Sequence, residues 1–163
     1  MRKLLLASVA LSLAGLGLAA CGSEPAEQTE TAPDGIPGVT VTNARLILPA
    51  VKGNPAAVYF DLSYGDPGTS PRVGLSRVHV AGAKSATLHE YSEWNRQKTM
   101  MEMVPPVIAK GETLKFEPGG KHVMAMDLDE SLVAGGSTEV TLTFAGGDKL
   151  SFPAEIRGAG DER

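Results

Sequence analysis

Short runs of alternating apolar and polar residues, separated by clusters of Gly, Pro, Asn and Asp, fill the chain from residue 39 onward. No stretch of this region keeps the apolar spacing of about 3.6 residues that an amphipathic helix needs, so the pattern predicts strands. We therefore expect an all-β domain. Its predicted strands cover residues 39–48, 56–63, 75–81, 85–92, 99–104, 113–117, 122–128, 138–144 and 149–156.

Turn signals separate these strands. Glu117-Pro118-Gly119-Gly120 and Ala145-Gly146-Gly147-Asp148 each offer the positive-φ positions that a tight turn requires, so we expect a hairpin at each. Pro105-Pro106 cannot lie in a central strand and predicts a loop over residues 104–112. Evenly spaced short strands with such turns favour a Greek-key β-sandwich, immunoglobulin-like or cupredoxin-like in outline.

The first 38 residues have the composition of an export and attachment segment. Residues 1–20 join Arg2 and Lys3 to an apolar run that ends in small residues, which is typical of a secretory signal peptide. Leu18-Ala19-Ala20-Cys21 resembles the lipobox of bacterial lipoproteins, whose cysteine carries the lipid. We expect export to the periplasm or cell envelope, with a membrane anchor at Cys21.

Residues 22–38 are rich in Pro, Gly, Glu and Thr and have no apolar period, so they predict a flexible linker. Four segments result: a signal peptide at 1–20, the lipidated cysteine and linker at 21–38, a β-sandwich domain at 39–158 and a tail at 159–163.

The charge and the cysteine count restrict the function. The chain has 15 Lys and Arg and 19 Asp and Glu, and loss of Arg2 and Lys3 with the signal leaves 13 basic residues and a net charge of about −6. This acidic balance disfavours nucleic acid as a partner. The only cysteine is Cys21, so once it is acylated no thiolate remains for catalysis, and the sequence has no Gly-x-Ser-x-Gly motif. We expect a monomeric protein that is not an enzyme.

Methionine and histidine are concentrated in one part of the sequence. Apart from the initiator, all methionines fall between residues 100 and 126, and two of the three histidines, His89 and His122, flank or enter this window. Strand alternation places His122, Met124 and Met126 on one face of HVMAM and Val123 and Ala125 on the other. Packing alone could explain methionine, which fills irregular gaps in a core.

Neutral imidazole and thioether groups form a poor acid–base site and a good site for a soft metal, and Cu(I) is the natural guest. Zinc prefers Cys, His and carboxylate. A blue-copper site needs a cysteine thiolate, which this chain lacks beyond Cys21.

The spacing of these residues resembles a known family. His89, ten residues, Met100, twenty-one residues and His122-Val123-Met124 match the H-x10-M-x21-H-x-M pattern of the periplasmic Cu(A) chaperones, PCuAC, and the flanking words PGGKHVMAM and VTLTF are similar. The resemblance, over residues 39–157, implies a cupredoxin-like sandwich that holds one Cu(I) for delivery to a respiratory copper oxidase. The implied partner is the Cu(A) subunit of cytochrome oxidase or another copper chaperone.

By position, the resemblance implies that His89, Met100, His122 and Met124 are the metal ligands. Family members commonly have Met-x-Met followed by Arg-Pro, and Met101-Glu102-Met103-Val104-Pro105 fits that local pattern whereas Met100 fits the spacing. Met103 is therefore an alternative to Met100, and alternation allows only one of the two to face the site. The final residues AEIRGAGDER contain no His or Met, so we expect one copper site.

Other readings stay open at this stage. Tyr91 and Trp94 could shield copper from solvent or cap the sandwich, and His79 lies in a plain alternating strand outside the pattern. The protein could be a metal-free envelope lipoprotein that serves adhesion or assembly, or it could store or detoxify copper instead of delivering it.

Overall fold

The computed structural model describes residues 35–94 and 96–161, which lie in one compact unit that spans residues 32–163. Its described residues form strands and turns without a helix, as expected for an all-β domain. The strands are β1 (Val39–Ile47), β2 (Ala56–Tyr64), β3 (Arg72–Val80), β4 (Ala83–Trp94), β5 (Gln97–Glu102), β6 (Val107–Ala109), β7 (Thr113–Phe116), β8 (His122–Leu128), β9 (Ser137–Phe144) and β10 (Lys149–Arg157).

Each of the nine predicted strands is present, with ends that differ from the prediction by up to three residues. The loop predicted over residues 104–112 is wrong in its centre, because β6 lies there and pairs with β3. Proline does not prevent this strand, since Pro105 and Pro106 precede it and β6 ends the path of paired strands. The side chain of Ile108 in β6 is buried and belongs to the core.

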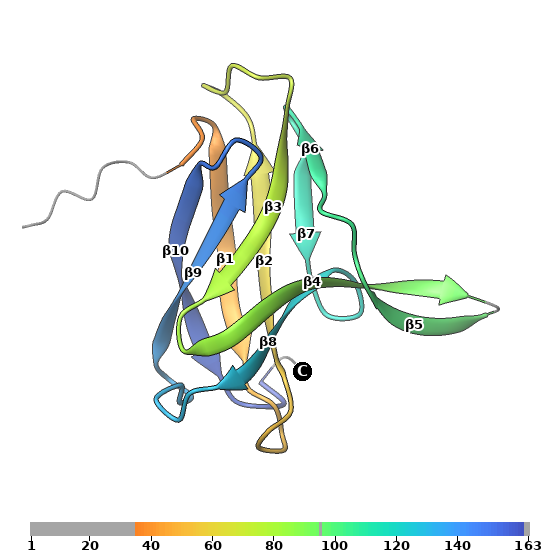
Figure 1. The fold of residues 1–163 in the computed structure, drawn as a ribbon, viewed down its shortest axis with the longest axis vertical. Coiled ribbons are helices and arrows are strands. Elements are labelled where there is room, and N and C mark those ends of the chain that lie inside the picture. Colours follow the sequence, from red (N-terminus) through yellow and green to blue (C-terminus); the bar gives the residue numbers. More distant parts are fainter. Residues whose placement is uncertain (1–34, 95, 162–163) are drawn as a thin grey trace, which may run out of the picture. The chain divides into compact units, whose positions relative to one another are not determined.

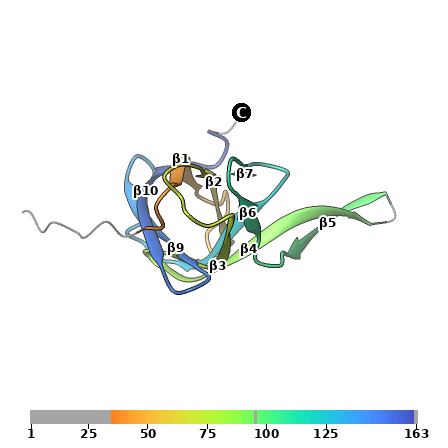
Figure 2. The same cartoon turned by 90° about the horizontal axis from the view of Figure 1, so that it is seen from above.

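The strands form one hydrogen-bonded path that curls around a core. Its order is β5-β4-β8-β2-β1-β10-β9-β3-β6, and β7 also pairs with β2. β1 and β10 pair in parallel, and the other strand pairs in the described chain are antiparallel. Figure 2 shows β1, β2, β10, β9, β3, β6 and β7 arranged around the core in end view.

Strict alternation on the central strand β2 builds this core. Ala56, Val58, Phe60, Leu62 and Tyr64 are buried, and the residues between them are only half-buried. The Phe60 ring stacks on that of Phe116 with centroids 4.4 Å apart. A side-chain period of two residues thus turns one face of the strand toward the interior.

Only one of the two expected hairpins forms. β9 and β10 are an antiparallel pair whose turn is closed by a hydrogen bond from the Phe144 amide to the Asp148 carbonyl, 2.8 Å. The Pro118-Gly119-Gly120 segment does turn, but β7 and β8 do not form a hairpin. β7 pairs with residues 60–63 of β2 and β8 with residues 56–58, so both lie along the same edge of β2. The turn signal located the bend correctly and could not specify the pairing partner.

β4 and β5 form a long hairpin that extends away from the other strands (Figure 1). β4 pairs with β8 along residues 83–89 and with β5 along residues 89–94, so His89 stands where the two pairings meet. Every described side chain of β5 is exposed. In residues 35–94 and 96–161, no helix is long and apolar enough to cross a bilayer.

Candidate metal centre

Strand register gathers the histidines and methionines named above on one face. His89 of β4 lies directly opposite His122 of β8, and Thr87 lies opposite Met124. On the other side of β4, Tyr91 lies opposite Met100 of β5. Directly paired residues project to the same side of a sheet, and so do residues two apart on one strand. His89, Met100, His122 and Met124 therefore share a face, although they come from three strands.

His122 is the most enclosed of these side chains, with 5% of its surface exposed. Its Nδ1 lies 3.1 Å from the carbonyl oxygen of Gly120, which can only accept a hydrogen bond, so Nδ1 carries the proton and donates. The neutral ring then has its lone pair on Nε2. The backbone of the Pro-Gly-Gly turn thus fixes both the tautomer and the orientation of the ring.

The Nε2 atom of His122 lies 3.2 Å from the Sδ atom of Met100. A thioether sulfur has no proton to donate, so in the neutral ring two lone-pair donors face each other. That arrangement becomes favourable when both atoms bind one cation, or when Nε2 carries a proton that it donates to the sulfur. Nitrogen and sulfur bound at about 2.0 and 2.3 Å to one tetrahedral ion would be about 3.5 Å apart, close to the observed separation.

His89 lies beside this pair. Its ring is roughly parallel to that of His122, with an interplanar angle of 23° and centroids 6.0 Å apart. The Nδ1 atom of His89 is 3.3 Å from the hydroxyl oxygen of Thr87, a contact that orients the ring. Because Thr87 precedes His89 by two residues on one strand, it shares the face with the histidine. The Thr-x-His spacing is visible in the sequence, but the sequence analysis did not identify Thr87 as part of the site.

Met124 completes the group at an open groove of about 370 Å³. Met100, His122 and Met124 line this groove together with Tyr91, whereas His89 does not. Met124 also lies opposite Ala57 of β2, which places it between β2 and β4. The structure thus brings three of the four predicted side chains to the groove wall and places the fourth against the ring of His122.

The remaining methionines lie elsewhere. Met103 is 7% exposed, packs with the core, and its amide donates a hydrogen bond to the Leu88 carbonyl, 3.0 Å. Met101 lies opposite Glu90, on the face of the hairpin that points away from Met100. Met126 lies further along β8, opposite Ser85. Alternation thus separates Met100 from Met103, as expected, and β4 pairing decides which of them lies beside His122.

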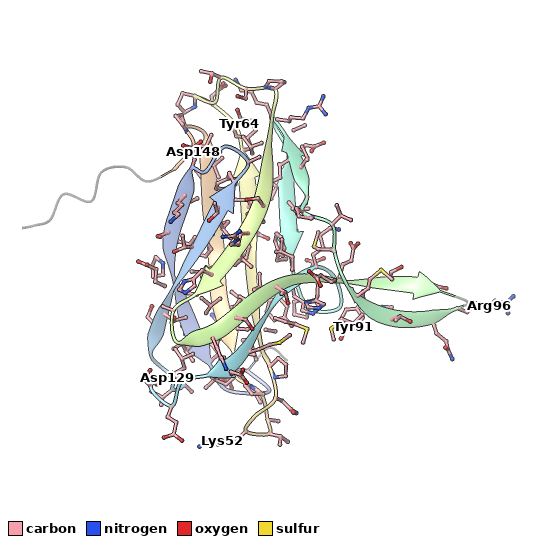
Figure 3. All side chains as sticks on the ribbon, in the orientation of Figure 1. Lys52, Tyr64, Tyr91, Arg96, Asp129 and Asp148 are labelled. Atoms are coloured by element: carbon pink, nitrogen blue, oxygen red, sulfur yellow. The ribbon has the colours of Figure 1, made fainter. Side chains whose placement is uncertain are left out.

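Tyr91 lies at the base of the projecting hairpin, with Arg96 at its far end (Figure 3). Its ring is 5.5 Å from the ring of His122 and tilted by 31°. The side chain is 43% exposed, so it covers part of the group and leaves the remainder open. Trp94 contributes its backbone to β4, and its side chain lies outside the described part of the structure.

The charged residues nearby do not form a second donor set. Within the described residues, no cluster of three or more His, Cys, Asp or Glu side chains could hold a metal ion. Lys121 pairs with Glu90 at 3.7 Å. A hard divalent ion would require oxygen or mixed nitrogen and oxygen donors, so the arrangement favours a soft monovalent cation.

Comparison with known sequences decides the family. The model of the family described as "Putative lipoprotein LpqE-like" matches residues 39–156. A relative named "Putative lipoprotein Lxx21020", from Leifsonia xyli subsp. xyli, is 32% identical over 143 residues, which cover 87% of this chain and 83% of the relative. This chain belongs to the LpqE-like family. The LpqE-like match includes the whole groove and every residue of the predicted ligand set.

Solved structures similar to this LpqE-like chain are PCuAC domains. The copper-bound PCuAC domain of PmoF2 has a TM-score of 0.60 at 17% identity and covers 76% of this chain and 96% of its own length. The apo PCuAC domain of PmoF1 has a TM-score of 0.61 at 21% identity, over 76% and 97% of the two chains. Cu(I)-loaded DR1885 of Deinococcus radiodurans has a TM-score of 0.53 at 20% identity, over 85% and 89%. The predicted cupredoxin-like β-sandwich is therefore confirmed as the fold.

Proposed function

We propose that this LpqE-like protein is a copper(I) chaperone that binds one Cu(I) through His89, Met100, His122 and Met124. The observation that supports the proposal most is the approach of His122 Nε2 to Met100 Sδ, 3.2 Å, with Nδ1 of the same ring held by a carbonyl oxygen. Two unprotonated donors so close together are favourable around a cation that both bind, and the alternative is a ring that also carries a proton on Nε2 and donates it to the sulfur. The copper-bound state of two proteins with the same fold is in keeping with this assignment.

The donor set favours Cu(I) over zinc. All four side chains are neutral when bound, and two of them are polarizable thioethers, which suit a soft monovalent ion. Zinc sites use thiolate, imidazole and carboxylate donors, and the described residues offer no cluster of those types. Since Met100 is exposed at an open groove, bound copper would stay within reach of another protein's donors. These properties suit transfer and require no catalysed reaction.

A copper titration under reducing conditions tests the proposal. Cu(I) is added to residues 35–163 in competition with a chromogenic chelator, and one equivalent should bind. The double variant His122→Ala/Met124→Ala should lose at least about 100-fold in affinity, because loss of a group that only orients a ligand already costs 10–100-fold. The matched control is His79→Ala/Met101→Ala, which removes the same two residue types from exposed positions outside the groove.

Two results would refute the proposal. The first is no stoichiometric uptake by the native chain. The second is equal loss of affinity in the test variant and in the control. The control should instead match the native protein, since neither of its residues faces His122.

We further propose that the protein is exported and held at a membrane through Cys21, with residues 1–20 removed. The family description supports this, and Leu18-Ala19-Ala20-Cys21 supplies the sequence required. These residues lie outside the described structure. Labelling of cells with a fatty-acid analogue should mark the native protein and leave Cys21→Ser unlabelled.

The recipient we propose is a respiratory copper oxidase, through its Cu(A) subunit or through another chaperone. Deletion of the gene should lower oxidase activity in copper-poor medium, and added copper should restore it. Unchanged oxidase activity together with increased copper sensitivity would instead indicate storage or detoxification.

A further inference from the structure

Strand β5 forms one end of the path of paired strands, and its outer side has no partner strand among the described residues. The β4–β5 hairpin extends away from the other strands (Figure 1), and every described side chain of β5 is exposed. An unpaired edge of this kind presents a row of free amide and carbonyl groups, to which a further strand can bind.

The hydrogen bonds of the hairpin show which backbone groups are free. The Met103 amide donates to the Leu88 carbonyl, 3.0 Å, so these two opposed residues are a hydrogen-bonded pair. Hydrogen-bonded and non-hydrogen-bonded pairs alternate along an antiparallel ladder. Residues 97, 99 and 101 of β5 therefore bond to β4, whereas the backbone groups of Lys98, Met100 and Glu102 point away from β4.

The charges of this outward row are complementary to themselves. Lys98 and Glu102 have opposite signs and lie two residues to either side of Met100. Among the described residues, neither takes part in an ion pair. If a second β5 pairs antiparallel in a register centred on Met100, Lys98 of each copy lies directly opposite Glu102 of the other. Opposite charges in directly opposed positions stabilise a strand pair.

Other registers of the same pairing are less favourable. Only outward-facing residues can form the hydrogen-bonded pairs, so the second strand can shift only by steps of two residues. A shift of two residues places Lys98 or Glu102 opposite the neutral Met100, and a shift of four places like charges opposite each other. Charged side chains on an edge strand generally deter pairing. On β5 they deter other strands and favour a second copy of the same strand.

We propose that β5 pairs antiparallel with β5 of a second copy of this chain, with Met100 opposite Met100, so that one sheet of order β4-β5-β5-β4 joins two molecules. Each Lys98 then lies between Glu93, which is opposite it in its own hairpin, and Glu102 of the second copy. Because the interface is one short strand on each side, the dimer is weak and reversible. The sequence alone favoured a monomer, since the free edge of β5 is visible only in the structure.

This dimer does not depend on a metal ion. Opposed residues project to the same side of a sheet, so the two Met100 side chains lie on one face and both proposed copper sites stay open on that face. The inference is therefore independent of the proposed function, and metal-free protein tests it.

Charge reversal tests the pairing. The protein used is residues 21–163 with Cys21→Ser, which contains no cysteine. In sedimentation equilibrium this protein should form dimers as its concentration approaches about 1 mM, the range expected for so small an interface. Lys98→Glu alone and Glu102→Lys alone should each associate at least about tenfold more weakly, because the symmetry of the dimer makes both charged pairs repulsive at once.

Two further samples restore opposite charges across the interface. A mixture of the Lys98→Glu protein with the Glu102→Lys protein should form heterodimers at least as well as the native chain forms dimers, because every Glu then lies opposite a Lys. The double variant Lys98→Glu/Glu102→Lys should again form homodimers. The matched controls are Lys149→Glu and Glu139→Lys, which make the same changes of charge at exposed positions of β10 and β9 and should behave as native.

Disulfide formation tests the register in a second way. In the dimer, Thr99 lies opposite Met101 of the second copy in a non-hydrogen-bonded pair, with Cα atoms about 4.5 Å apart. That separation allows a disulfide, whereas the two Thr99 residues, and likewise the two Met101 residues, lie on a diagonal at about 7–8 Å. When Thr99→Cys and Met101→Cys proteins are mixed, the mixed disulfide should form at least about tenfold faster than either symmetric one, as measured by mass spectrometry.

Several results would overturn the inference. A native chain that stays monomeric at about 1 mM would leave the edge to a strand of another protein. A dimer that Lys98→Glu or Glu102→Lys weakens no more than the controls do would use another surface. Failure of the mixed variants to associate, or equal rates for the three disulfides, would exclude this register. Copper binding is measured separately, so failure of the dimer leaves the proposed function standing and failure of copper binding leaves the dimer standing.

Discussion

Single residues at this site differ sharply in their surroundings. Met100 and Met101 are adjacent in sequence and similarly exposed, at 42% and 44%, yet they point to opposite faces of the β4–β5 hairpin. Only Met100 contacts His122. Met100 and Met101 can therefore serve as test and control within one molecule, because their solvent exposure is similar and only Met100 lies at the proposed copper site.

We expect metal to protect Met100 from oxidation and to leave Met101 unprotected. Ag(I) replaces Cu(I) in this experiment because it is also a soft monovalent ion and does not react with peroxide as copper does. At a free Ag(I) concentration ten times its Kd, sulfoxide formation at Met100 should slow about tenfold, in proportion to the empty fraction of the site. Mass spectrometry of the peptides measures both residues. Equal protection of Met101, or no protection of Met100, would contradict the ligand assignment.

The choice between Met100 and Met103 can be tested with single leucine variants. Met100→Leu should remove one sulfur neighbour from the copper X-ray absorption spectrum and weaken binding by about 10–100-fold or more. Met103→Leu keeps a similar volume in the core and should cost less than about 1.5 kcal/mol of stability, with the copper spectrum unchanged. A spectrum altered only by Met103→Leu would transfer the ligand role to the buried residue.

At the scale of elements, the turn between β7 and β8 links the backbone to the site. Gly119 has a φ of 76°, which an L-residue with a side chain rarely adopts, and the next residue supplies the carbonyl that fixes His122. Nothing lies within 4 Å of a Cβ built at Gly119. The backbone conformation alone therefore demands glycine there.

Gly119→Ala should lower the free energy of unfolding by about 1–2 kcal/mol, the cost of the left-handed conformation. It should also weaken Cu(I) binding by about tenfold, because the shifted turn moves an orienting hydrogen bond. Gly147→Ala is the control, since Gly147 has a φ of 99° and equally open surroundings in the β9–β10 turn. Urea unfolding and copper titration measure both. Loss of affinity in both variants would mean that general destabilisation, and not the turn, weakens binding.

At the scale of the whole molecule, the core and the site occupy different regions. Phe60 is fully buried and stacks on Phe116 within the sandwich, whereas the groove lies where the hairpin leaves it. Damage to the core should therefore lower stability without removing the metal site.

Phe60→Ala should lower the free energy of unfolding by about 3–5 kcal/mol, from lost burial and the cavity left behind. Free Cu(I) at 100 times its Kd should still raise the stability of native and variant proteins by about 2.7 kcal/mol each. Urea unfolding with and without copper measures both effects. The control Val104→Ala, at an exposed position, should stay within about 0.5 kcal/mol of native. Loss of the copper effect in Phe60→Ala would show that core and site are coupled.

Much of the fold follows from local pattern. The alternation of apolar and polar residues located these strands, because burial of one face of a strand requires an apolar side chain at every second position, as at Val123 and Ala125 of β8. The β6 strand escaped detection because three residues are too short for a period to appear. The hairpin expected between β7 and β8 does not form. The turn residues specify only where the chain bends, whereas the pairing depends on a distant strand: β7 pairs with residues 60–63 of β2 and β8 with residues 56–58.

The sequence by itself determined nine of the ten strands in the described residues, the β9–β10 hairpin, and the opposite orientations of Met100 and Met103, since each depends on neighbouring residues. Tertiary structure decided that β4 lies between β5 and β8, and this pairing alone places Met100 beside His122 and Met103 in the core. It also provided the groove wall from β2 and the loop before it. These features depend on contacts between residues far apart in the chain, whose pairing the local periodicity does not specify.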